Sequence, residues 1–192
     1  ELYGHAIEQY RLRHVDGYNG PFKNQLGLLH FLRKVCTDPR ERGKAFDHES
    51  LSDARQKNPK LDWLINTLEQ IQRQGEKVII FCEFRDMQLV LAYYIEQVFK
   101  LRPDIINGDT SAAEASAESR QKRIKEFQSV PGFGAIILSP VAVGFGVNIQ
   151  AANHVIHFTR TWNPAKEDQA TDRAYRIGQT RDVYVYYPVV CA

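Results

Sequence analysis

Short apolar runs separated by helix-like stretches are the feature that most constrains the fold of this chain. Five strand candidates share this character: Val78–Phe81, Ile105–Ile106, Ala135–Leu138, Val155–Phe158 and Val183–Tyr187. Runs this short and apolar suit strands that are covered on both faces, as in parallel sheets. Because they alternate with helices, they favour a parallel sheet with right-handed crossover connections. We therefore predict an α/β domain, with any ligand bound at the carboxyl ends of the strands.

The stretches between these runs carry apolar residues at helical spacing. The clearest stripe contains Leu61, Leu64, Ile65, Leu68 and Ile71, and Gly75 is predicted to end that helix. The other predicted helices are the stripe of Met87, Leu91, Tyr94 and Val98, the polar segment 112–128 with Ile124 and Phe127 facing inward, and residues 164–176. Each of these helices lies between two predicted strands, as a crossover connection requires.

The N-terminal part of the chain has a different character. Residues 1–36 have apolar positions near helical spacing, and Pro39 is expected to close that segment. Residues 37–59 are polar, charged and rich in helix breakers, so we interpret them as a connecting loop. The predicted organisation is a helical lead-in with a charged loop at 1–59, followed by one lobe at 60–192.

Composition limits the classes of function. With 43% hydrophobic residues, the 192 residues can build one domain with a sizeable core. The formal net charge of +2 is too small to indicate nucleic-acid binding by itself, so any DNA contact must come from local patches. Cys36, Cys82 and Cys191 are far apart and lack CxxC spacing, which argues against a disulfide framework or a zinc site.

The ends of the chain and its hydropathy suggest its context. No apolar run approaches the length of a membrane span, and no signal-peptide pattern is present. We therefore expect a cytoplasmic protein without a membrane partner. The chain begins at Glu1 and stops at Ala192 just after an apolar run, so we interpret it as a piece of a longer protein.

The segment with the clearest chemistry is WNPAKEDQATDRAYRIGQ, residues 162–179. Gln169, Arg173 and Arg176 have i, i+4 and i+7 spacing, which places them on one face of a helix. Two guanidinium groups and an amide on one stripe can bind the oxygens of a phosphoryl group, and such arginines stabilise the charge that develops during phosphoryl transfer. The alternative is a solvated helix with an Asp172–Arg176 pair.

The same segment contains signals for both ends of that helix. Asn163 can cap the amino end, and Pro164 fits the first helical position. Gly178 can serve as the stop at the carboxyl end. These signals predict that the Gln169 stripe lies within a single helix.

A glycine-containing segment follows the predicted strand at 135–138. Gly144 and Gly146 let the backbone approach a ligand closely, and Asn148 adds a side-chain donor and acceptor. A plain tight turn is the default alternative. The segment is not a dinucleotide-binding fingerprint, because the third glycine and the acidic residue at the required distance are missing.

Two further groups of residues have competing interpretations. A basic cluster, Arg120, Lys122, Arg123 and Lys125, is either a contact for the phosphate backbone or a solvated helix face. His154 and His157 have the appearance of metal ligands, but their spacing on a strand sends them to opposite faces. We predict packing or surface roles for both histidines and no metal site on this chain.

Two absences from the sequence point to a missing partner. The chain has no GxxxxGK[ST] phosphate loop, and no Asp-Glu pair follows an apolar strand to hold magnesium. The residues that bind the β-phosphate and the metal ion in phosphoryl transfer are thus expected elsewhere. Arginines of this kind without a phosphate loop imply a partner lobe.

These motifs together resemble a known family. VIIFCEF (78–84), NGDT (107–110), SPVAVGFGVN (139–148), WNP (162–164) and DQATDRAYRIGQ (168–179) occur in the order seen in the second lobe of Swi/Snf-type ATPases of helicase superfamily 2. LRKVCTDP (32–39) is similar to the helical lead-in of that lobe, and the resemblance covers nearly the whole chain from about residue 21. It implies a RecA-like parallel sheet flanked by helices.

The resemblance also assigns residues to roles. Arg173 and Arg176 match the arginines that reach ATP across the cleft between two lobes, and Gln169 matches the glutamine of the same motif. Gly144, Gly146 and Asn148 match the glycine-turn segment near the nucleotide, whereas Gly108, Arg120, Ser139 and Trp162 match segments along the DNA side of the cleft. The expected partners are ATP with Mg²⁺, duplex DNA and the N-terminal RecA-like lobe of the same protein.

One segment departs from the family pattern. The common run reads Ser-Thr-Lys-Ala-Gly-Gly-Glu-Gly-Leu-Asn-Leu, but here Pro140 and Val141 replace Thr-Lys, Val143 replaces a glycine and Phe145 replaces the acidic residue. Loss of that lysine is expected to weaken a phosphate contact. The run HFTRTWNPAKEDQATDRAYRIGQ looks more like bacterial members than chromatin-remodelling ones, so we expect a nucleoid-associated enzyme.

The expected function is that of one of the two lobes of an ATP-hydrolysing enzyme. The parent enzyme is expected to hydrolyse ATP and to move along duplex DNA, and the isolated lobe is expected to be inactive. A strand-separating DNA or RNA helicase is the first alternative, and a non-catalytic RecA-like scaffold is the second. A small-molecule α/β enzyme is disfavoured, because the chain offers neither a phosphate loop nor an acid–base pair.

Overall fold

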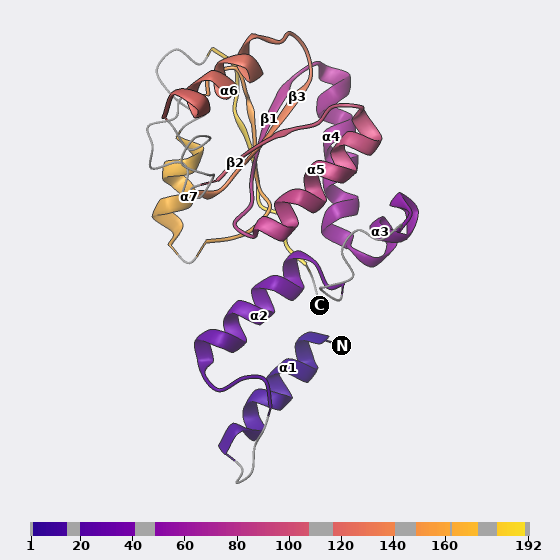
Figure 1. The fold of residues 1–192 in the computed structure, drawn as a ribbon, viewed down its shortest axis with the longest axis vertical. Coiled ribbons are helices and arrows are strands. Elements are labelled where there is room, and N and C mark those ends of the chain that lie inside the picture. Colours follow the sequence, from indigo (N-terminus) through magenta and orange to yellow (C-terminus); the bar gives the residue numbers. More distant parts are fainter. Residues whose placement is uncertain are drawn as a thin grey trace.

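A parallel β-sheet forms the centre of the protein (Figure 1). The computed structural model describes residues 2–14, 20–40, 49–107, 117–140, 149–161, 163–172 and 180–190. Within them the strands are β1 Lys77–Phe81, β2 Asp104–Ile106, β3 Gly134–Leu138, β4 His154–His157 and β5 Tyr184–Tyr186. Their order across the sheet is β2-β3-β1-β4-β5, and all four pairings are parallel. The predicted sheet is confirmed.

Helices cover both faces of this sheet. The helices are α4 Pro59–Gln74, α5 Arg85–Phe99, α6 Ala117–Ser129 and α7 Pro164–Thr171. Apolar side chains of α4 and α5 share one buried cluster with the sheet, whereas Ile124 of α6 and Ala170 of α7 belong to the cluster on the other face. The predicted α/β architecture, a parallel sheet flanked by helices, is therefore confirmed.

The central strand β1 divides its side chains between the two clusters. Val78 and Ile80 pack toward α4 and α5, whereas Ile79 and Phe81 pack toward α6 and α7. All four side chains are fully buried. Because full burial of one such side chain stabilises the fold by roughly 1.5–3 kcal/mol, this strand is a main source of stability.

The ends of α4 follow from its sequence. The Asn58 side chain caps the amino end by accepting a hydrogen bond from the Leu61 backbone N–H at 3.1 Å, and Pro59 occupies the first helical position. Gly75 ends the helix in the left-handed conformation, with φ of 67°. The stop predicted at Gly75 is confirmed, since a residue without a Cβ enters this region at little cost.

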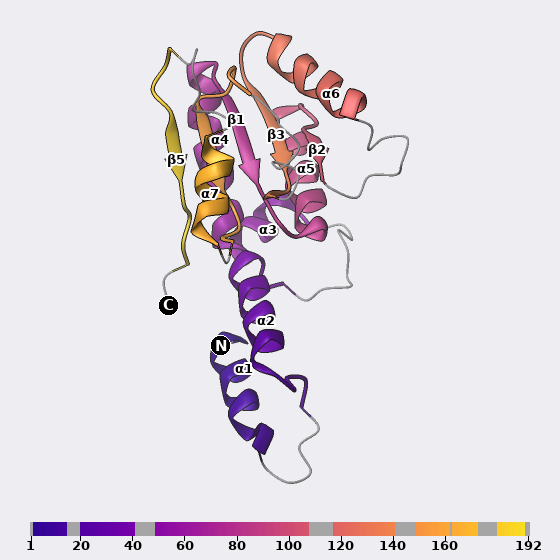
Figure 2. The same cartoon turned by 90° about the vertical axis from the view of Figure 1, so that its left-hand side faces the viewer.

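The N-terminal helices extend away from the carboxyl end of the sheet (Figure 2). They are α1 Leu2–Arg11, a 3₁₀ turn at Leu12–His14, and α2 Gln25–Thr37. Ala6, Phe22, Leu28 and Leu32 form a small buried cluster between them. The helical lead-in predicted for 1–36 is interrupted, because residues 20–24 are not helical and α2 begins after its cap, Asn24.

The segment 37–59 is not a loop throughout, contrary to the prediction. It contains the helix α3, Leu51–Lys57, which begins after the cap Ser50. Only Ala54 of this helix is buried, so it lacks the apolar stripe that makes a helix visible in a sequence. Its charged side chains form ion pairs with neighbouring residues, since Lys57 contacts Glu49 at 2.6 Å and Arg55 contacts Asp62 at 2.5 Å.

Candidate functional site

A polar residue follows the carboxyl end of each strand, and together these residues line one edge of the sheet, the carboxyl edge. Glu83 follows β1, Asn107 follows β2, Ser139 follows β3, Thr159 follows β4 and Tyr187 follows β5. Because all pairings are parallel, these positions lie along one edge. This carboxyl edge is the place where α/β proteins bind their ligands.

Hydrogen bonds tie the segments of the carboxyl edge to one another. The Glu83 backbone N–H donates to the Thr159 hydroxyl at 2.8 Å, which joins the ends of β1 and β4. The Gln88 side chain donates to the Cys82 carbonyl at 2.7 Å and accepts from Asn107 at 3.0 Å. The edge is therefore held by side chains as well as by the sheet.

A buried carboxylate connects the end of β4 to α7. The Glu167 side chain is only 3% exposed, and its oxygens accept from the Arg160 guanidinium at 2.9–3.1 Å and from the Thr161 backbone N–H at 2.7 Å. Burial by itself raises the pKa of Glu167, but these hydrogen bonds and the charge of Arg160 outweigh it and lower the pKa. The carboxylate thus stays ionised and fixes the loop to the helix.

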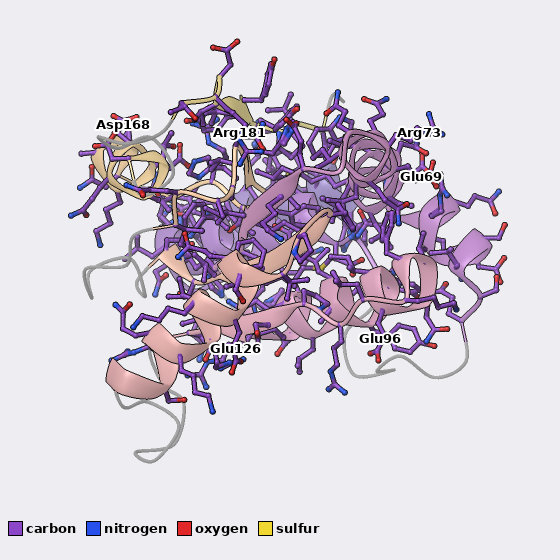
Figure 3. The ribbon with its side chains drawn as sticks, turned by 90° about the horizontal axis from the view of Figure 1, so that it is seen from above. Glu69, Arg73, Glu96, Glu126, Asp168 and Arg181 are labelled. Atoms are coloured by element: carbon purple, nitrogen blue, oxygen red, sulfur yellow. The ribbon has the colours of Figure 1, made fainter. Side chains whose placement is uncertain are left out.

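The first turn of α7 is defined by its sequence signals. The Asn163 side chain accepts from the Ala165 backbone N–H at 3.0 Å, and Pro164 is the first helical residue, so both predicted start signals are confirmed. Asp168 is exposed on this helix (Figure 3). The described helix ends at Thr171, and residues 173–179 lie outside the described residues.

His157 lies beneath α7 at the end of β4. Its Nε2 is 2.9 Å from the Thr171 hydroxyl, and its ring stacks between Phe81 and Tyr187 at centroid distances of 5.2 and 4.9 Å. Burial lowers the pKa of His157 to about 4, although the nearby charge of Glu167 opposes that shift. His157 is thus a neutral packing residue, as the sequence predicted.

The neutral His157 predicts a loss of stability in mild acid. The unfolded imidazole takes up a proton below pH 6.5, whereas the folded one resists protonation until about pH 4. The free energy of unfolding should therefore fall as the pH drops from 6.5 to 4, by at most on the order of 3 kcal/mol. Urea unfolding of this chain at a series of pH values measures this.

The control for that measurement is His157→Phe, which keeps a ring between Phe81 and Tyr187 but cannot titrate. The carboxyl groups titrate in both proteins, so the difference between the two curves isolates the histidine. The wild-type chain should lose more stability than the variant between pH 6.5 and 4. Parallel curves across that interval would contradict the assignment.

The other histidine, His154, lies at the opposite end of β4. Its Nε2 is 2.5 Å from a Glu76 carboxylate oxygen, and its Nδ1 is 3.0 Å from the Tyr186 hydroxyl. Burial alone raises the pKa of Glu76, but hydrogen bonds from His154 and Asn153 lower it overall. In the described part of the chain, no three His, Cys, Asp or Glu side chains could hold a metal ion. The contact of His154 with Tyr186 gives it a packing role that joins β4 to β5.

The predicted basic cluster on α6 is divided in its roles. Arg123 donates to the Asp104 carboxylate at 2.7 Å and to the Ile105 carbonyl at 3.2 Å, so it anchors α6 to β2. Lys122 is exposed and lies 3.9 Å from Glu126. Arg123 is thus engaged within the fold, whereas Lys122 and Lys125 are exposed to solvent.

Comparison with known proteins identifies the family of this chain. The family model described as "Helicase conserved C-terminal domain" matches residues 59–178. The chain belongs to this family. The Zorya protein ZorD of Escherichia coli O139:H28 (strain E24377A / ETEC) is 58% identical over 193 residues, which cover 99% of this chain and 17% of that protein. The putative ATP-dependent helicase/translocase YwqA of Bacillus subtilis (strain 168) is 37% identical over 161 residues, which cover 84% of this chain and 16% of that protein.

Solved structures agree with this family. The Sulfolobus solfataricus SWI2/SNF2 ATPase core in complex with dsDNA is similar with a TM-score of 0.72 and 30% identity, over 97% of this chain and 37% of that one. The Sulfolobus solfataricus SWI2/SNF2 ATPase C-terminal domain gives a TM-score of 0.67 and 25% identity, over 97% of this chain and 71% of that one. The resemblance to the second lobe of Swi/Snf-type ATPases, with its RecA-like fold, is therefore confirmed.

The described residues place three of the site residues predicted for this helicase C-terminal domain. Ser139 is buried at the carboxyl edge, where its backbone N–H donates to the Ile106 carbonyl at 2.9 Å. Gln169 is exposed on α7, and Arg120 is partly exposed on α6, which covers the same face of the sheet. The others, Gly108, Gly144, Gly146, Asn148, Trp162, Arg173 and Arg176, lie outside the described residues.

Sequence reasoning missed the charged residues that hold this helicase domain's carboxyl edge together. Arg160 and Glu167 lie seven residues apart, a spacing that spans a loop and a helix start and so has no helical or strand periodicity. The available signal was an acidic residue in the first turn of a predicted helix, close after a lone arginine.

Among the helices that the structure describes, none is long and apolar enough to cross a membrane.

Proposed function

We propose that this chain is the second lobe of an ATP-dependent translocase that acts on duplex DNA. The lobe would span residues 60–192, and residues 1–59 would form its lead-in. ZorD and YwqA are about six and about five times as long as this chain, because the 193 and 161 aligned residues cover 17% and 16% of their lengths. The additional length of these relatives has room for the other lobe that the proposal requires.

The observation that carries the proposal is the anchoring of α7 ahead of the arginine-containing run. Glu167 of α7 is held by Arg160 and by the Thr161 N–H, as described above. The run DRAYRIGQ begins at the end of this helix, and it includes Arg173 and Arg176. A rigid support for the chain just before these arginines suits residues that must meet a phosphoryl group with accurate geometry.

The proposed mechanism uses both lobes. The partner lobe would supply the phosphate loop and the Mg²⁺ ligands, neither of which has a sequence motif on this chain. ATP would bind between the lobes and supply the phosphoryl group, with Gly144, Gly146 and Asn148 near the nucleotide. Closure of the lobes would bring Arg173 and Arg176 to the γ-phosphoryl group, so closure and hydrolysis would be coupled.

Duplex DNA is the proposed substrate along which the enzyme moves. Support comes from the solved structure of a Swi2/Snf2 core with dsDNA, to which this chain is similar. Gly108, Arg120, Ser139 and Trp162 are the residues proposed to lie along the DNA. Cycles of closure and opening would then move both lobes along the DNA backbone, and the isolated lobe would be inactive because it holds only half of the ATP site.

ATP turnover by the full-length protein tests this function. We expect duplex DNA to raise the turnover number about tenfold or more, which corresponds to about 1.4 kcal/mol in activation free energy, and single strands to have a smaller effect. Displacement of a labelled strand from a duplex would favour the strand-separating alternative. Absence of turnover in a folded protein that has its phosphate loop would favour the scaffold alternative.

A further inference from the structure

The lead-in helix α2 contacts the carboxyl edge of the sheet through one arginine. The Arg33 side chain is 17% exposed, and its Nη2 donates both to the Glu83 carboxylate and to the Arg160 carbonyl, the latter at 2.6 Å. These acceptors follow different strands, because Glu83 follows β1 and Arg160 follows β4. One side chain thus joins the lead-in to two segments of the edge.

Neighbouring residues of α2 make this contact a docking face rather than an isolated ion pair. The His30 ring meets the Phe84 ring edge-on at 5.6 Å, and the charged groups of Arg33 and Lys34 each lie 5.6 Å from the same ring. His30, Arg33 and Lys34 have i, i+3 and i+4 spacing, so they share one side of the helix. An arginine suits the central position because its planar fork can serve several acceptors at once.

Arg160 transmits this contact to α7. Its carbonyl accepts from Arg33, while its own guanidinium binds the buried Glu167 carboxylate of α7 at 2.9 Å. The adjacent Thr159 hydroxyl accepts from the Glu83 backbone N–H, so Glu83 is held at both its backbone and its side chain. A continuous set of hydrogen bonds therefore runs from α2, through the loop after β4, to the helix that precedes Arg173.

We infer that Arg33 is a positioning residue for the proposed ATP site. This inference rests on the proposed function and adds a residue of the lead-in to it. Arg33 sets the position of the loop after β4, and through Glu167 it sets the position of α7 and of the arginines that follow. In the two-lobe enzyme, the orientation of the lead-in helix is thereby coupled to the placement of Arg173 and Arg176.

Arg33→Ala in the full-length protein tests this coupling. A displacement of about 1 Å at a reacting group can lower a rate about a hundredfold, so we expect the kcat of duplex-stimulated ATP hydrolysis to fall about tenfold or more. The KM for ATP should change little, because the arginines act on the transition state. Arg33→Lys, which keeps the charge but not the fork, should have an intermediate kcat.

Arg40→Ala is the matched control. The Arg40 side chain has a similar exposure, 18%, but its guanidinium binds Asp38 at 2.5 Å and Glu49 at 2.9 Å instead of the loop after β4. If Arg33 only stabilised the fold, both variants would lower the melting temperature and leave the kcat of the folded enzyme unchanged. A specific loss of kcat in Arg33→Ala supports positioning, and equal kcat values in the two variants would overturn it.

Two further variants keep the test decisive. Arg176→Ala, assayed in parallel, should abolish turnover. If it does so while Arg33→Ala keeps the wild-type kcat, the positioning role is wrong and the proposed function stands. If Arg176→Ala keeps full turnover, the proposed function falls and the inference falls with it. Should Arg33→Ala not fold, Arg33→Met keeps the apolar stem beside Phe84 but removes every donor to Glu83 and to the Arg160 carbonyl, and an unchanged kcat in that variant would overturn the inference.

Discussion

Replacing Arg176 by alanine in the full-length protein should lower duplex-stimulated ATP turnover about a thousandfold or more. The guanidinium is proposed to meet the γ-phosphoryl group, where charge spreads over the oxygens in the transition state. Alanine removes that charge and its fork of donors. Single-turnover hydrolysis with saturating ATP and duplex DNA is the appropriate measurement, because it isolates the chemical step.

Arg173→Ala should have a comparable effect, and the double variant should lose much less than the product of the two single losses, because residues that act as one unit are not additive. Lys166→Ala is the matched control, since Lys166 is an exposed cation on α7. Binding of duplex DNA should be similar in all of these proteins. Wild-type turnover in Arg176→Ala would show that the arginine stripe is a solvated helix face.

Much of the fold could be predicted because its signals are local. The apolar runs at the centres of β1 and β3 are fully buried on both faces, and the stripe of α4 faces one buried cluster. Helix ends were predictable for the same reason, since Asn163 and Gly75 act within one turn of their own positions. Such features depend on residues that are close in sequence.

The features that could not be predicted depend on distant partners. Arg33 forms hydrogen bonds with Glu83 and Arg160, which lie 50 and 127 positions away in the sequence. No helical or strand periodicity relates these three residues. The helix α3 was hidden for a different reason, because a short helix with one buried residue and several charged ones looks like a charged loop. The candidate site was visible only through its motifs, whereas the residues that support it, such as Glu167, required the three-dimensional contacts.

Replacing Phe81 by alanine should have the largest effect on stability, a loss of about 3–5 kcal/mol in the free energy of unfolding. Phe81 is fully buried at the end of the central strand, and its ring stacks on His157 at 5.2 Å. Its neighbours belong to the sheet and to α6 and α7, which limits how far they can collapse into the space left behind. Urea unfolding of this chain at neutral pH, followed by circular dichroism, measures the loss.

Two comparisons define what that result means. Leu26→Ala removes a side chain that is 75% exposed, so its effect should stay within about 0.5 kcal/mol. Phe81→Leu keeps part of the buried volume and should lie between the two. The Phe81 carbonyl accepts from the Phe158 N–H at 2.9 Å, so the strand that carries this ring also holds the start of the loop after β4. A loss below about 1 kcal/mol for Phe81→Ala would mean that the carboxyl edge can repack, and a site supported by such an edge could not hold α7 in one position.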